Sequence, residues 1–504
     1  MDFVVVGRRS AVESHPARDV VRLERSAWDD FGFKTLFLAT VFLRDGTRRT
    51  IGELKIVEQH QESGQTPLPE RFGRLGPDFA SLGQDIGYYE ALMDLPAAVR
   101  RAYLRAIRDA AADATILRAF EETRAWQVSV LRFGQAQNAL EAGSRLLSGR
   151  TETFGRLSFD FTRRLADRDV VVPFGFEDDD VLPGRCNVVI GYNGAGKTKL
   201  LADLAMTASK VSTDSQEVGG ARAGVLSGSD TTFGAVVAVS YSAFDSFALP
   251  PTGGATGETE FFGYVYCGLR RPKQPRAGYP APGWELKSTE AIRVEFAQAL
   301  RTARRRDSAS LRRALSLLDD EPSFGRVGVR AAGLLARPRA TADRHFDRMS
   351  SGHKIVVNIV AQLAAHLQKR SLVLIDEPES HLHPPLLAAF LRAVQSLLHD
   401  HDSFAILATH SPVVLQEIPS RYIRVLDRAG DTLTVLEPEV ETFGENLGAI
   451  TRYVFSLDSS KTDYQAVLRE LARRYSIAQI EEIFGGRLGA QAQALVLRYR
   501  REAE

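Results

Sequence analysis

Alternating apolar and polar positions mark the first structured segment of the chain. Residues 34–57 alternate around an Arg-Asp-Gly turn at 44–46, which is the pattern of a β-hairpin. From about Leu95 to Leu147, apolar residues instead recur three and four positions apart. This spacing predicts two or three helices. We therefore expect residues 1–150 to form an N-terminal α+β extension.

In the central part of the chain, strand patterns alternate with helical patterns. This layout covers about residues 151–440 and is typical of an α/β sheet. Two segments interrupt it, one rich in Ser, Thr and Gly (207–231) and one rich in Pro and Gly (269–284). A helical run over 285–318 follows the second interruption, so we expect a helical insert at about 268–345.

The end of the chain has helical spacing again. The helical spacing begins at Lys461. Paired glycines break a helix, so we expect an interruption at Gly485-Gly486. We expect residues 441–504 to form a C-terminal helical segment. The predicted fold class is α/β, with a helical insert lobe, an N-terminal α+β extension and a helical C-terminal tail.

Size and composition bound the class of protein. The 504 residues exceed the roughly 250–300 at which single cores stop growing, so we expect two or three domains. The 64 Lys and Arg balance the 63 Asp and Glu, which gives no global field for nucleic acid or an anionic membrane. Two cysteines are too few for a disulfide framework. Without a signal-peptide pattern or an apolar run of ~20 residues, we expect a cytoplasmic protein without membrane contact.

The strongest chemical signal follows an apolar strand at 186–190. The sequence GYNGAGKTKL fits the phosphate-binding pattern G-x-x-x-x-G-K-[ST] and continues as a helix. Glycines let backbone N–H groups turn toward a phosphate, and the helix N-terminus adds partial positive charge. We expect Lys197 to bridge the phosphates of ATP and Thr198 to hold Mg²⁺. The residues expected to bind the nucleotide here are Asn193, Gly194, Ala195, Gly196, Lys197, Thr198 and Lys199.

A pair of carboxylates follows a second apolar strand, at 372–375. Asp376 and Glu377 come at its carboxyl end, where α/β sheets bind their ligands. We expect Asp376 to hold Mg²⁺ through water and Glu377 to orient and deprotonate the attacking water. Two acids after a strand also suit a solvated turn, but the phosphate-binding loop in the same chain favours the chemical interpretation.

In order and approximate spacing, the motifs resemble those of ABC-type ATPases. The phosphate-binding loop is followed by MSSGH (349–353), DEPESHLHP (376–384) and ATHSP (408–412). The chain is similar to the branch that includes RecF, the SMC-type heads and the OLD-like defence ATPases. The resemblance implies a P-loop ABC-type ATPase head over about residues 151–440.

The same resemblance assigns roles to two further motifs. Ser350, Ser351 and Gly352 match the signature motif, which in the family contacts the γ-phosphate bound to the other protomer. His410 matches the switch histidine that senses this phosphate. Taken alone, the first motif is an ordinary helix N-cap and the second an ordinary core or turn histidine. In this company they imply a homodimer or higher oligomer that forms around ATP.

The sequence departs from the family pattern at the Q-loop. Residues 236–247 contain no glutamine, and the candidate polar groups are Ser242 and Asp245. About 100 residues separate Phe244 from Met349, too few for a long SMC-type coiled coil. His381 and His383, spaced i, i+2, do not match a zinc motif, and the resemblance makes them part of the D-loop, where dimer contacts occur.

Two basic clusters suit contact with DNA, and a solvated helix face also explains them. They are Arg270, Arg271, Lys273 and Arg276, and Arg301, Arg304, Arg305, Arg306, Arg312 and Arg313.

Two further segments resemble bacterial AAA-type antiphage ATPases such as Septu and retron-associated ATPases. They are FASLGQDIGYYEALMDLP (79–96) and ETFGENLGAITRYVF (441–455). A capped helix start with two packing tyrosines, Tyr88 and Tyr89, also explains the first segment.

Three functions follow from these patterns. The first is an ATP-hydrolysing switch that controls a partner effector, a nuclease or a toxin, in antiphage defence. The second is a RecF-like clamp that binds DNA in repair or chromosome maintenance. The third is a module that holds ATP as a structural ligand, and Glu377 argues against it because pure binding needs no catalytic carboxylate.

Overall fold

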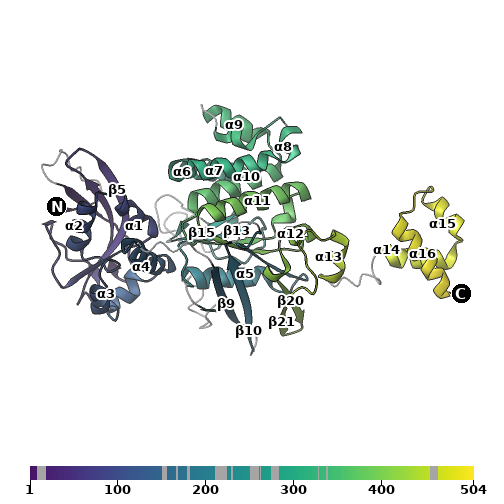
Figure 1. Ribbon diagram of the computed structural model, residues 1–504, viewed down its shortest axis with the longest axis horizontal. Coiled ribbons are helices and arrows are strands. Elements are labelled where there is room, and N and C mark those ends of the chain that lie inside the picture. Colours follow the sequence, from purple (N-terminus) through teal and green to yellow (C-terminus); the bar gives the residue numbers. More distant parts are fainter. Residues whose placement is uncertain are drawn as a thin grey trace.

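Figure 1 presents a computed structural model in which three parts follow one another along the chain: an N-terminal sheet with helices, a central unit and a group of C-terminal helices. It describes the whole chain except residues 8–18, 150–155, 166–167, 179–181, 211–223, 229–230, 250–259, 262, 274–282, 327, 336–338, 455–463 and 504. No helix among the described residues is long and apolar enough to cross a membrane. The domain boundaries at 150/151 and 440/441 stay predictions, and the first lies outside the described residues.

The N-terminal sheet has the strand order β7-β1-β2-β4-β5-β8. Its antiparallel pair β4–β5 aligns Leu36 with Lys55, which confirms the hairpin predicted over 34–57. Two short strands, β3 (Phe33–Lys34) and β6 (Gly64–Gln65), pair separately. The six strands of the larger sheet are β1 (Asp2–Val6), β2 (Val20–Arg25), β4 (Leu36–Phe42), β5 (Arg48–Glu58), β7 (Arg71–Phe72) and β8 (Phe79–Gly83).

Helices follow this sheet, as the spacing over 95–147 predicts. The Asp85 side chain caps the first helix by accepting from the Tyr88 amide at 2.8 Å, and Tyr88 and Tyr89 are fully buried. The predicted capped start is therefore confirmed. The helices are α1 (Ile86–Met93), α2 (Ala97–Ile107), α3 (Ala114–Phe120), the π-helix η1 (Trp126–Val130) and α4 (Gly134–Leu147).

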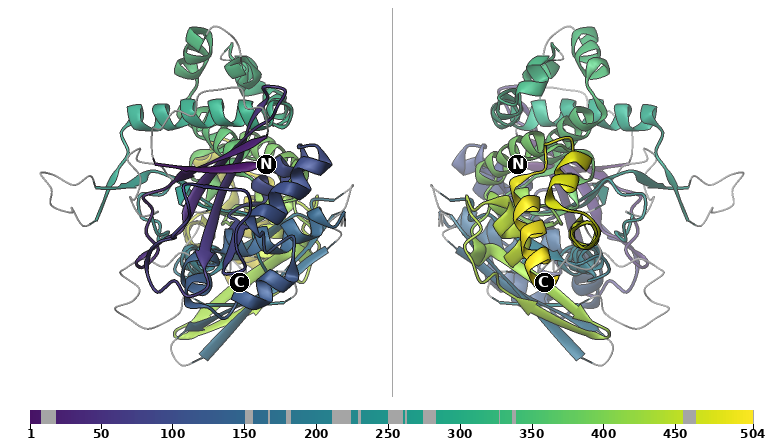
Figure 2. Two further views of the ribbon diagram at one scale, coloured as in Figure 1. Left: turned by 90° about the vertical axis from the view of Figure 1, so that its left-hand side faces the viewer. Right: turned by 90° about the vertical axis from the view of Figure 1, so that its right-hand side faces the viewer.

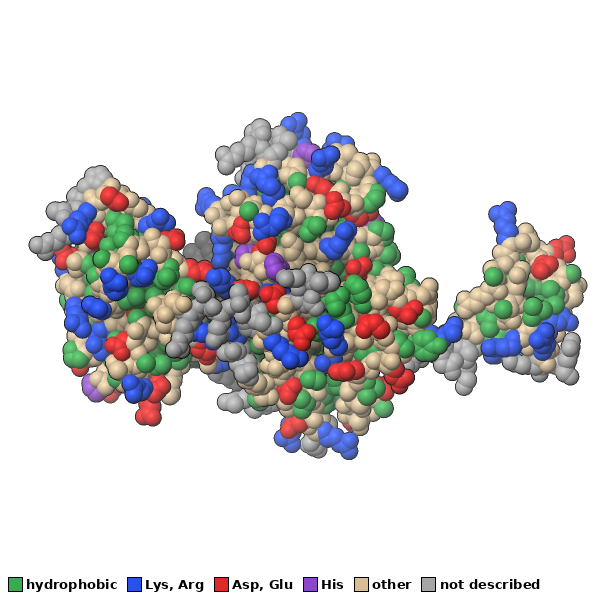
Figure 3. Space-filling model, viewed as in Figure 1, with side chains coloured by type: hydrophobic (Ala, Val, Ile, Leu, Met, Phe, Trp, Pro, Cys, Tyr) green, Lys and Arg blue, Asp and Glu red, His purple; other side chains and the backbone are tan. Residues whose placement is uncertain are grey.

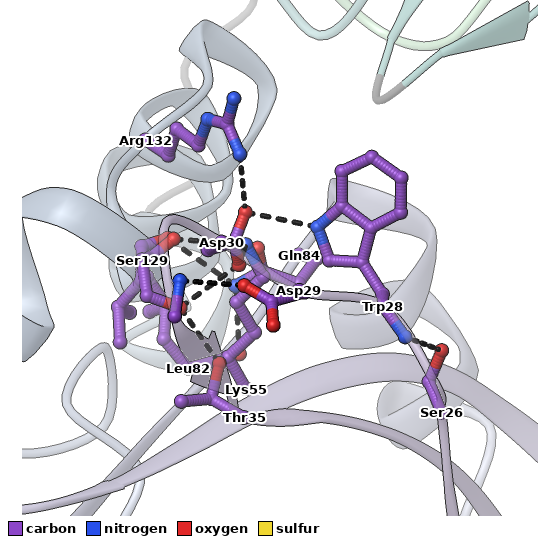
Figure 4. A network of polar contacts seen from close by, with 12 residues as sticks. Ser26, Trp28, Asp29, Asp30, Thr35, Lys55, Leu82, Gln84, Ser129 and Arg132 are labelled. Carbon is purple, nitrogen blue, oxygen red and sulfur yellow. Dashed lines mark hydrogen bonds and ion pairs between the residues drawn. The ribbon is translucent and has the colours of Figure 1, made fainter. Parts of the chain in front are cut away.

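A buried ionic network ties this part together (Figure 4). Asp30 and Lys55 are fully buried and pair at 2.8 Å between Oδ2 and Nζ. The same oxygen accepts from Ser129 Oγ at 2.9 Å, and Oδ1 accepts from Arg132 and from Trp28 Nε1, both at 2.9 Å. Each carboxylate oxygen thus has two donors, so the network is satisfied as buried charges require. It joins the β2–β3 loop to β5 and to the π-helix.

The central unit contains an eight-stranded sheet in the order β14-β15-β13-β18-β19-β11-β20-β21. Neighbours from β15 to β20 are parallel, and the edge strands β14 and β21 are antiparallel. Its inner strands are mostly apolar, as expected for strands that are covered on both faces. The strands are β11 (Cys186–Gly191), β13 (Val236–Ser240), β14 (Glu260–Phe261), β15 (Tyr264–Gly268), β18 (Leu372–Asp376), β19 (Phe404–Ala408), β20 (Ile423–Ala429) and β21 (Thr432–Leu436).

One face of this sheet packs on α5 (Lys197–Ser209). Beyond α5 lies a three-stranded antiparallel sheet of β9 (Arg156–Leu165), β10 (Arg168–Glu177) and β12 (Val225–Ser227). Apolar side chains of both sheets and of α5 form one core that includes Phe159, Phe174 and Leu204. Helix α5 extends to Ser209, and β12 lies within the Ser-, Thr- and Gly-rich interruption predicted over 207–231, so this interruption is shorter than predicted. Residues 211–223 and 229–230 of it lie outside the described residues.

The other face carries the helices predicted as an insert lobe. In Figures 1 and 2 they lie above the sheet, and their apolar sides share its second core. The predicted lobe contains α6 (Thr289–Arg306), α7 (Ser308–Asp319), α8 (Pro322–Arg326), η2 (Ala331–Leu335) and α9 (Arg339–Arg348). The helices that follow it, outside the predicted bounds of 268–345, are α10 (Ser351–His366), η3 (Pro378–His381), α11 (Pro384–Asp400), α12 (Pro412–Gln416), η4 (Ser420–Tyr422) and α13 (Leu447–Tyr453).

The start of the lobe differs from the sequence prediction. Instead of a helix from residue 285, β16 (Arg270–Pro272) and β17 (Trp284–Leu286) pair antiparallel. The helix begins only after Ser288, whose hydroxyl accepts from the Ala291 amide at 3.2 Å. Asp307 then caps α7 and divides the run over 285–318 into two helices.

The C-terminal helices have a small core of their own. It contains Leu468, Ile480 and Tyr499. Gly485 and Gly486 have positive φ angles of 58° and 70° and follow α15, which confirms the predicted break. The helices are α14 (Tyr464–Arg474), α15 (Ile477–Ile483) and α16 (Ala490–Ala503).

We predict that Asp30→Asn strongly destabilises the N-terminal part. Removing one partner leaves the buried Lys55 ammonium without its counter-charge, which costs about 3–5 kcal/mol. Unfolding in denaturant, followed by the fluorescence of Trp28 and Trp126, measures this change. Asp94→Asn is the matched control, because Asp94 pairs with Arg49 at the surface at 3.5 Å and such pairs contribute about 0–1 kcal/mol. Equal stability of the two variants would contradict the structural role of the network.

Candidate functional site

The order of the sheet brings three loops together. The strands β18, β19 and β11 are adjacent and parallel, so their carboxyl ends lie at one edge. Asp376 ends β18, Thr409 and His410 follow β19, and Gly191 ends β11. Residues from three separate motifs of the sequence therefore meet at this edge.

The loop after β11 has the backbone that its glycines permit. Gly194 and Gly196 have φ angles of 85° and 95°, which side chains disfavour. A Cβ at Gly191 would lie 2.5 Å from the Leu426 carbonyl oxygen. Helix α5 starts at Lys197, so its unpaired N–H groups face the loop, as an anion site requires.

Lys197 lies at the centre of the site. Its Nζ donates to the carbonyl oxygens of Gly191 at 3.1 Å and Tyr192 at 3.4 Å. It also lies 2.6 Å from His410 Nε2. Burial lowers the pKa of Lys197, and the charges of Glu377, Asp376 and Glu379 oppose this change. The lysine is thus a poorly solvated cation among carboxylates.

The two residues predicted to hold metal contact each other. Thr198 Oγ1 lies 3.0 Å from each carboxylate oxygen of Asp376. Burial raises the pKa of Asp376 to about 7, and the nearby charges of Glu377 and Asp245 act in the same direction. Hydroxyl and carboxylate oxygens are ligands that Mg²⁺ accepts. A bound cation would restore the ionised form that burial disfavours.

Glu377 has an unusual backbone for a residue with a side chain. Its φ is 46°, a left-handed conformation that costs of order 1–3 kcal/mol and clusters at functional sites. Its amide donates to the Ala408 carbonyl at 2.9 Å, which holds it beside β19. Its Oε1 lies 3.4 Å from His410 Nε2. Burial and the Lys197 charge lower the pKa of His410, which favours the neutral imidazole.

Glu379 is a site residue that the sequence reasoning missed. Its Oε1 accepts from Thr409 Oγ1 at 2.8 Å and from the His410 amide at 2.6 Å. It therefore fixes the loop that carries His410. The only available signal was a second glutamate two positions after Glu377.

The signature residues open helix α10. Ser350 is its N-cap, and its Oγ lies 2.8 Å from His353 Nδ1. The opposite nitrogen of His353 lies 2.7 Å from Ser323 Oγ. A Cβ at Gly352 would lie 3.0 Å from the His381 carbonyl oxygen, so the signature and the predicted D-loop pack closely.

The signature does not join the site at Lys197 within one chain. Ser350 and Ser351 are exposed. Among the described residues, no hydrogen bond or ion pair links 350–352 to Lys197, Asp376 or Glu377. Their predicted role therefore requires a second chain.

The Q-loop candidates take different positions. Asp245 is buried and accepts from Tyr266 Oη at 2.7 Å and from Arg270, so its carboxylate is held within the chain. Ser242 lies after β13, the strand beside β18, and its Oγ accepts from the Phe244 amide at 3.1 Å. Of the two, Ser242 is the more available to a ligand.

Much of the basic surface predicted to touch DNA contacts the chain itself. Arg271 pairs with Glu285 and Arg313 with Asp400, both at 2.7 Å. Arg270 contacts Asp245, Arg304 donates to the Leu335 carbonyl, and Arg306 donates to the Ala365 carbonyl. Arg276 lies outside the described residues. Contact with DNA through these clusters stays a prediction.

The fold and the residues at this edge of the sheet resemble those of ABC-type ATPases of the P-loop class. A model of the family "AAA domain, putative AbiEii toxin, Type IV TA system" matches residues 273–416. The match includes the signature, Asp376, Glu377 and His410 but not the phosphate-binding loop.

Over nearly its whole length, the chain belongs to the family of protein ea59 from Escherichia phage lambda. The two are 31% identical over 538 aligned positions, which cover 98% of this chain and 97% of ea59. The chain is also similar to the retron Vc95 probable ATPase of Vibrio cholerae, with 28% identity over 19% of this chain and 21% of that protein.

Solved structures with some likeness include ATPase subunits and heads. An ATP-binding cassette of an ABC transporter in its ADP conformation is 11% identical, with a TM-score of 0.30, over 60% of this chain and 96% of that chain. The SMC head domain from Thermotoga maritima is 13% identical, with a TM-score of 0.26, over 57% of this chain and all of that chain.

Proposed function

We propose that this protein hydrolyses ATP with Mg²⁺ in a site completed by a second copy of the chain, and that this cycle controls a partner effector. The observation that carries the proposal is the meeting of Lys197, Thr198, Asp376, Glu377 and His410 at one edge of the sheet. These groups come from three strands and are separated by up to 213 positions in the sequence.

In this proposal the chain supplies a cradle for the triphosphate. The N–H groups of residues 193–199 face the β-phosphate, and Lys197 moves from the Gly191 and Tyr192 carbonyls to phosphate oxygens. Thr198 and Asp376 would hold Mg²⁺. The metal would supply charge neutralisation at the phosphates. Ser242 is the candidate for the place of the missing glutamine.

We predict that the affinity for Mg²⁺ and ATP depends on the protonation of Asp376. The pKa of about 7 leaves the carboxyl protonated at lower pH, so metal binding releases a proton. Affinity should then fall about tenfold per pH unit below that pKa. Calorimetric titration of Mg²⁺·ATP against pH measures this dependence.

Asp376→Asn is the control for this pH series. ATP itself also gains a proton as the pH falls, and this contribution is common to both proteins. The asparagine variant should bind Mg²⁺·ATP more weakly. Its affinity should also lose the part of the pH dependence that comes from Asp376. An identical pH dependence in the two proteins would remove Asp376 from the metal site.

Hydrolysis in this proposal depends on Glu377. The left-handed backbone aims its carboxylate beside His410, at the edge where the γ-phosphate would lie. Glu377 accepts a proton from the attacking water, and the neutral His410 contacts the γ-phosphate. Glu379 positions His410 through its amide and does not itself touch the substrate.

We predict that Glu377→Gln slows hydrolysis by about 10²–10⁴-fold, because a general base contributes this much, while ATP affinity changes little. Lys197→Ala should instead abolish ATP binding. Phosphate release and nucleotide titration measure the two effects. Glu439→Gln, on the exposed segment after β21, should match the wild type. A Glu377→Gln protein that hydrolyses ATP at the wild-type rate would favour the module that only holds ATP.

In this proposal, the signature residues of one chain complete the ATP site of the other chain in a dimer. Ser350 and Ser351 are exposed at the positive end of α10, where a hydroxyl and free N–H groups suit a phosphate. Because they are separated from Lys197 within one chain, we expect them to donate hydrogen bonds to the γ-phosphate bound by a neighbouring chain. Hydrolysis would remove the γ-phosphate and with it the contact that favours the closed dimer.

The assignment to antiphage defence is supported by the relatives. The matched family model carries a toxin–antitoxin description, and a retron ATPase matches in part. The relative that aligns over nearly the whole chain is a protein of a phage, which is consistent with a function in the interaction of phage and host. A separate effector is proposed because no nuclease-like acidic set follows Glu437 in the sequence.

Affinity capture tests effector control and the dimer together. We predict that the tagged Glu377→Gln protein forms a dimer in the presence of ATP and Mg²⁺. This dimer should capture a nuclease-like or toxin-like protein, which mass spectrometry identifies. The added substitution Ser351→Arg places a bulky cation at the interface, so it should give a monomer that captures none. DNA with repair factors and no effector would instead support the RecF-like clamp. An unchanged dimer with Ser351→Arg would place the interface elsewhere.

A further inference from the structure

A second basic site lies in the N-terminal part, away from the P-loop. A cavity of about 490 Å³ is bounded by α2, α3 and the end of α4. Its lining includes five arginines, namely Arg74, Arg100, Arg101, Arg105 and Arg108. Lys and Arg side chains spread over this part of the molecule at the left of Figure 3.

Two of the arginines lie on one side of α2, because Arg101 and Arg105 are four positions apart and residues at this spacing project from the same face of a helix. Arg108 is the C-cap of α2 and lines the same cavity. Arg108 is fixed by its surroundings. Its φ is 56°, its Nε donates to the Phe79 carbonyl at 2.7 Å, and its own carbonyl accepts from the Ser81 amide at 3.0 Å. The cavity thus has one anchored guanidinium beside a row of others.

Most of this positive charge is not neutralised within the chain. Among the described residues, the side chains of Arg74, Arg101 and Arg105 have no hydrogen-bond or ion-pair partner. Two acids line the cavity. Asp109 is fully buried and accepts from Tyr89 Oη at 3.2 Å and from the Ala111 amide at 3.0 Å, and burial raises its pKa to about 7. Asp113 caps α3 by accepting from the Thr115 amide at 2.9 Å.

The cavity also has an apolar and a hydroxyl component. Leu104 and Ile116 are buried, Leu147 is half-buried, and all three line it. Ser144 and Ser148, from the end of α4, add hydroxyl groups. An inorganic anion would use only the arginines, whereas a ligand with a phosphate and a flat ring would use both parts. The volume lies in the range of small-molecule sites, about 300–1,000 Å³.

We propose that this cavity binds the phosphate of a nucleotide, either free or within a single nucleic-acid strand. The phosphate lies against Arg101, Arg105 and Arg108, because guanidinium groups bind phosphate oxygens in a planar, bidentate way. The base packs against Leu104, Ile116 and Leu147. The site is distinct from the P-loop and does not depend on the proposed hydrolysis of ATP.

Binding to two probes tests the proposal. The first is AMP, measured by calorimetry, and the second is a fluorescein-labelled single-stranded DNA of about ten nucleotides, measured by anisotropy. All proteins are full-length and carry Lys197→Ala, so the P-loop contributes nothing to the difference between variants. The test pair is Arg101→Glu with Arg105→Glu. Arg118→Glu is the matched control, because Arg118 is exposed on α3 and does not line the cavity.

The expected result is that at least one probe binds the parent, that the double charge reversal weakens this binding by about tenfold or more, and that Arg118→Glu leaves it unchanged. Binding of AMP assigns a free nucleotide, and binding of the DNA alone assigns a strand. Arg101→Gln with Arg105→Gln replaces the charge reversal if circular dichroism shows that the latter disturbs folding. No binding of either probe, or equal binding by the parent and the double variant, would overturn the proposal.

Discussion

The parallel pairing of β11, β19 and β18 is the constraint on which the site depends. Because the three strands run in the same direction side by side, each delivers its following loop to one edge, however far apart the loops are in sequence. Both faces of the strands are buried, by α5 on one side and by helices that include α10 and α11 on the other. In the observed register Asp376 aligns with Ala408, and the amide of Glu377 donates to the Ala408 carbonyl. This pairing holds the two carboxylates beside the loop that carries His410.

The charges at this edge are arranged for a cation that the chain does not itself supply. Asp376, Glu377 and Glu379 all act on Lys197, and burial already works against ionisation of Asp376. One ammonium group cannot balance three carboxylates in a poorly solvated place. Thr198 adds an oxygen ligand rather than a charge. In the proposed function, a divalent ion held by Thr198 and Asp376 would offset the excess, and a nucleotide triphosphate would offset the charge of the ion. Binding of the metal and of the nucleotide would then be electrostatically coupled.

Local signals in the sequence predicted most of the site and much of the fold. The phosphate-binding loop, the hairpin over 34–57 and the breaks at paired glycines each depend on neighbours a few positions apart. Glu379 could not be assigned in this way, because its partner Thr409 belongs to another strand, 30 positions away. Nor could the pairing of Asp30 with Lys55, which only the folded N-terminal sheet brings together. The late start of α6 depends on a strand pair, β16–β17, whose Pro- and Gly-rich surroundings indicated only a loop.

Helix α4 relates the N-terminal part to the ATPase core in physical terms. Its last turn lines the arginine cavity with Ser144, Leu147 and Ser148. Its first turn packs on the end of α5, where a Cβ at Gly134 would lie 2.6 Å from the Ala208 carbonyl oxygen. Between them, Asn138 donates to the Thr232 carbonyl at 3.3 Å. Helix α5 starts at Lys197, so two packed helices span from the cavity to the phosphate-binding loop.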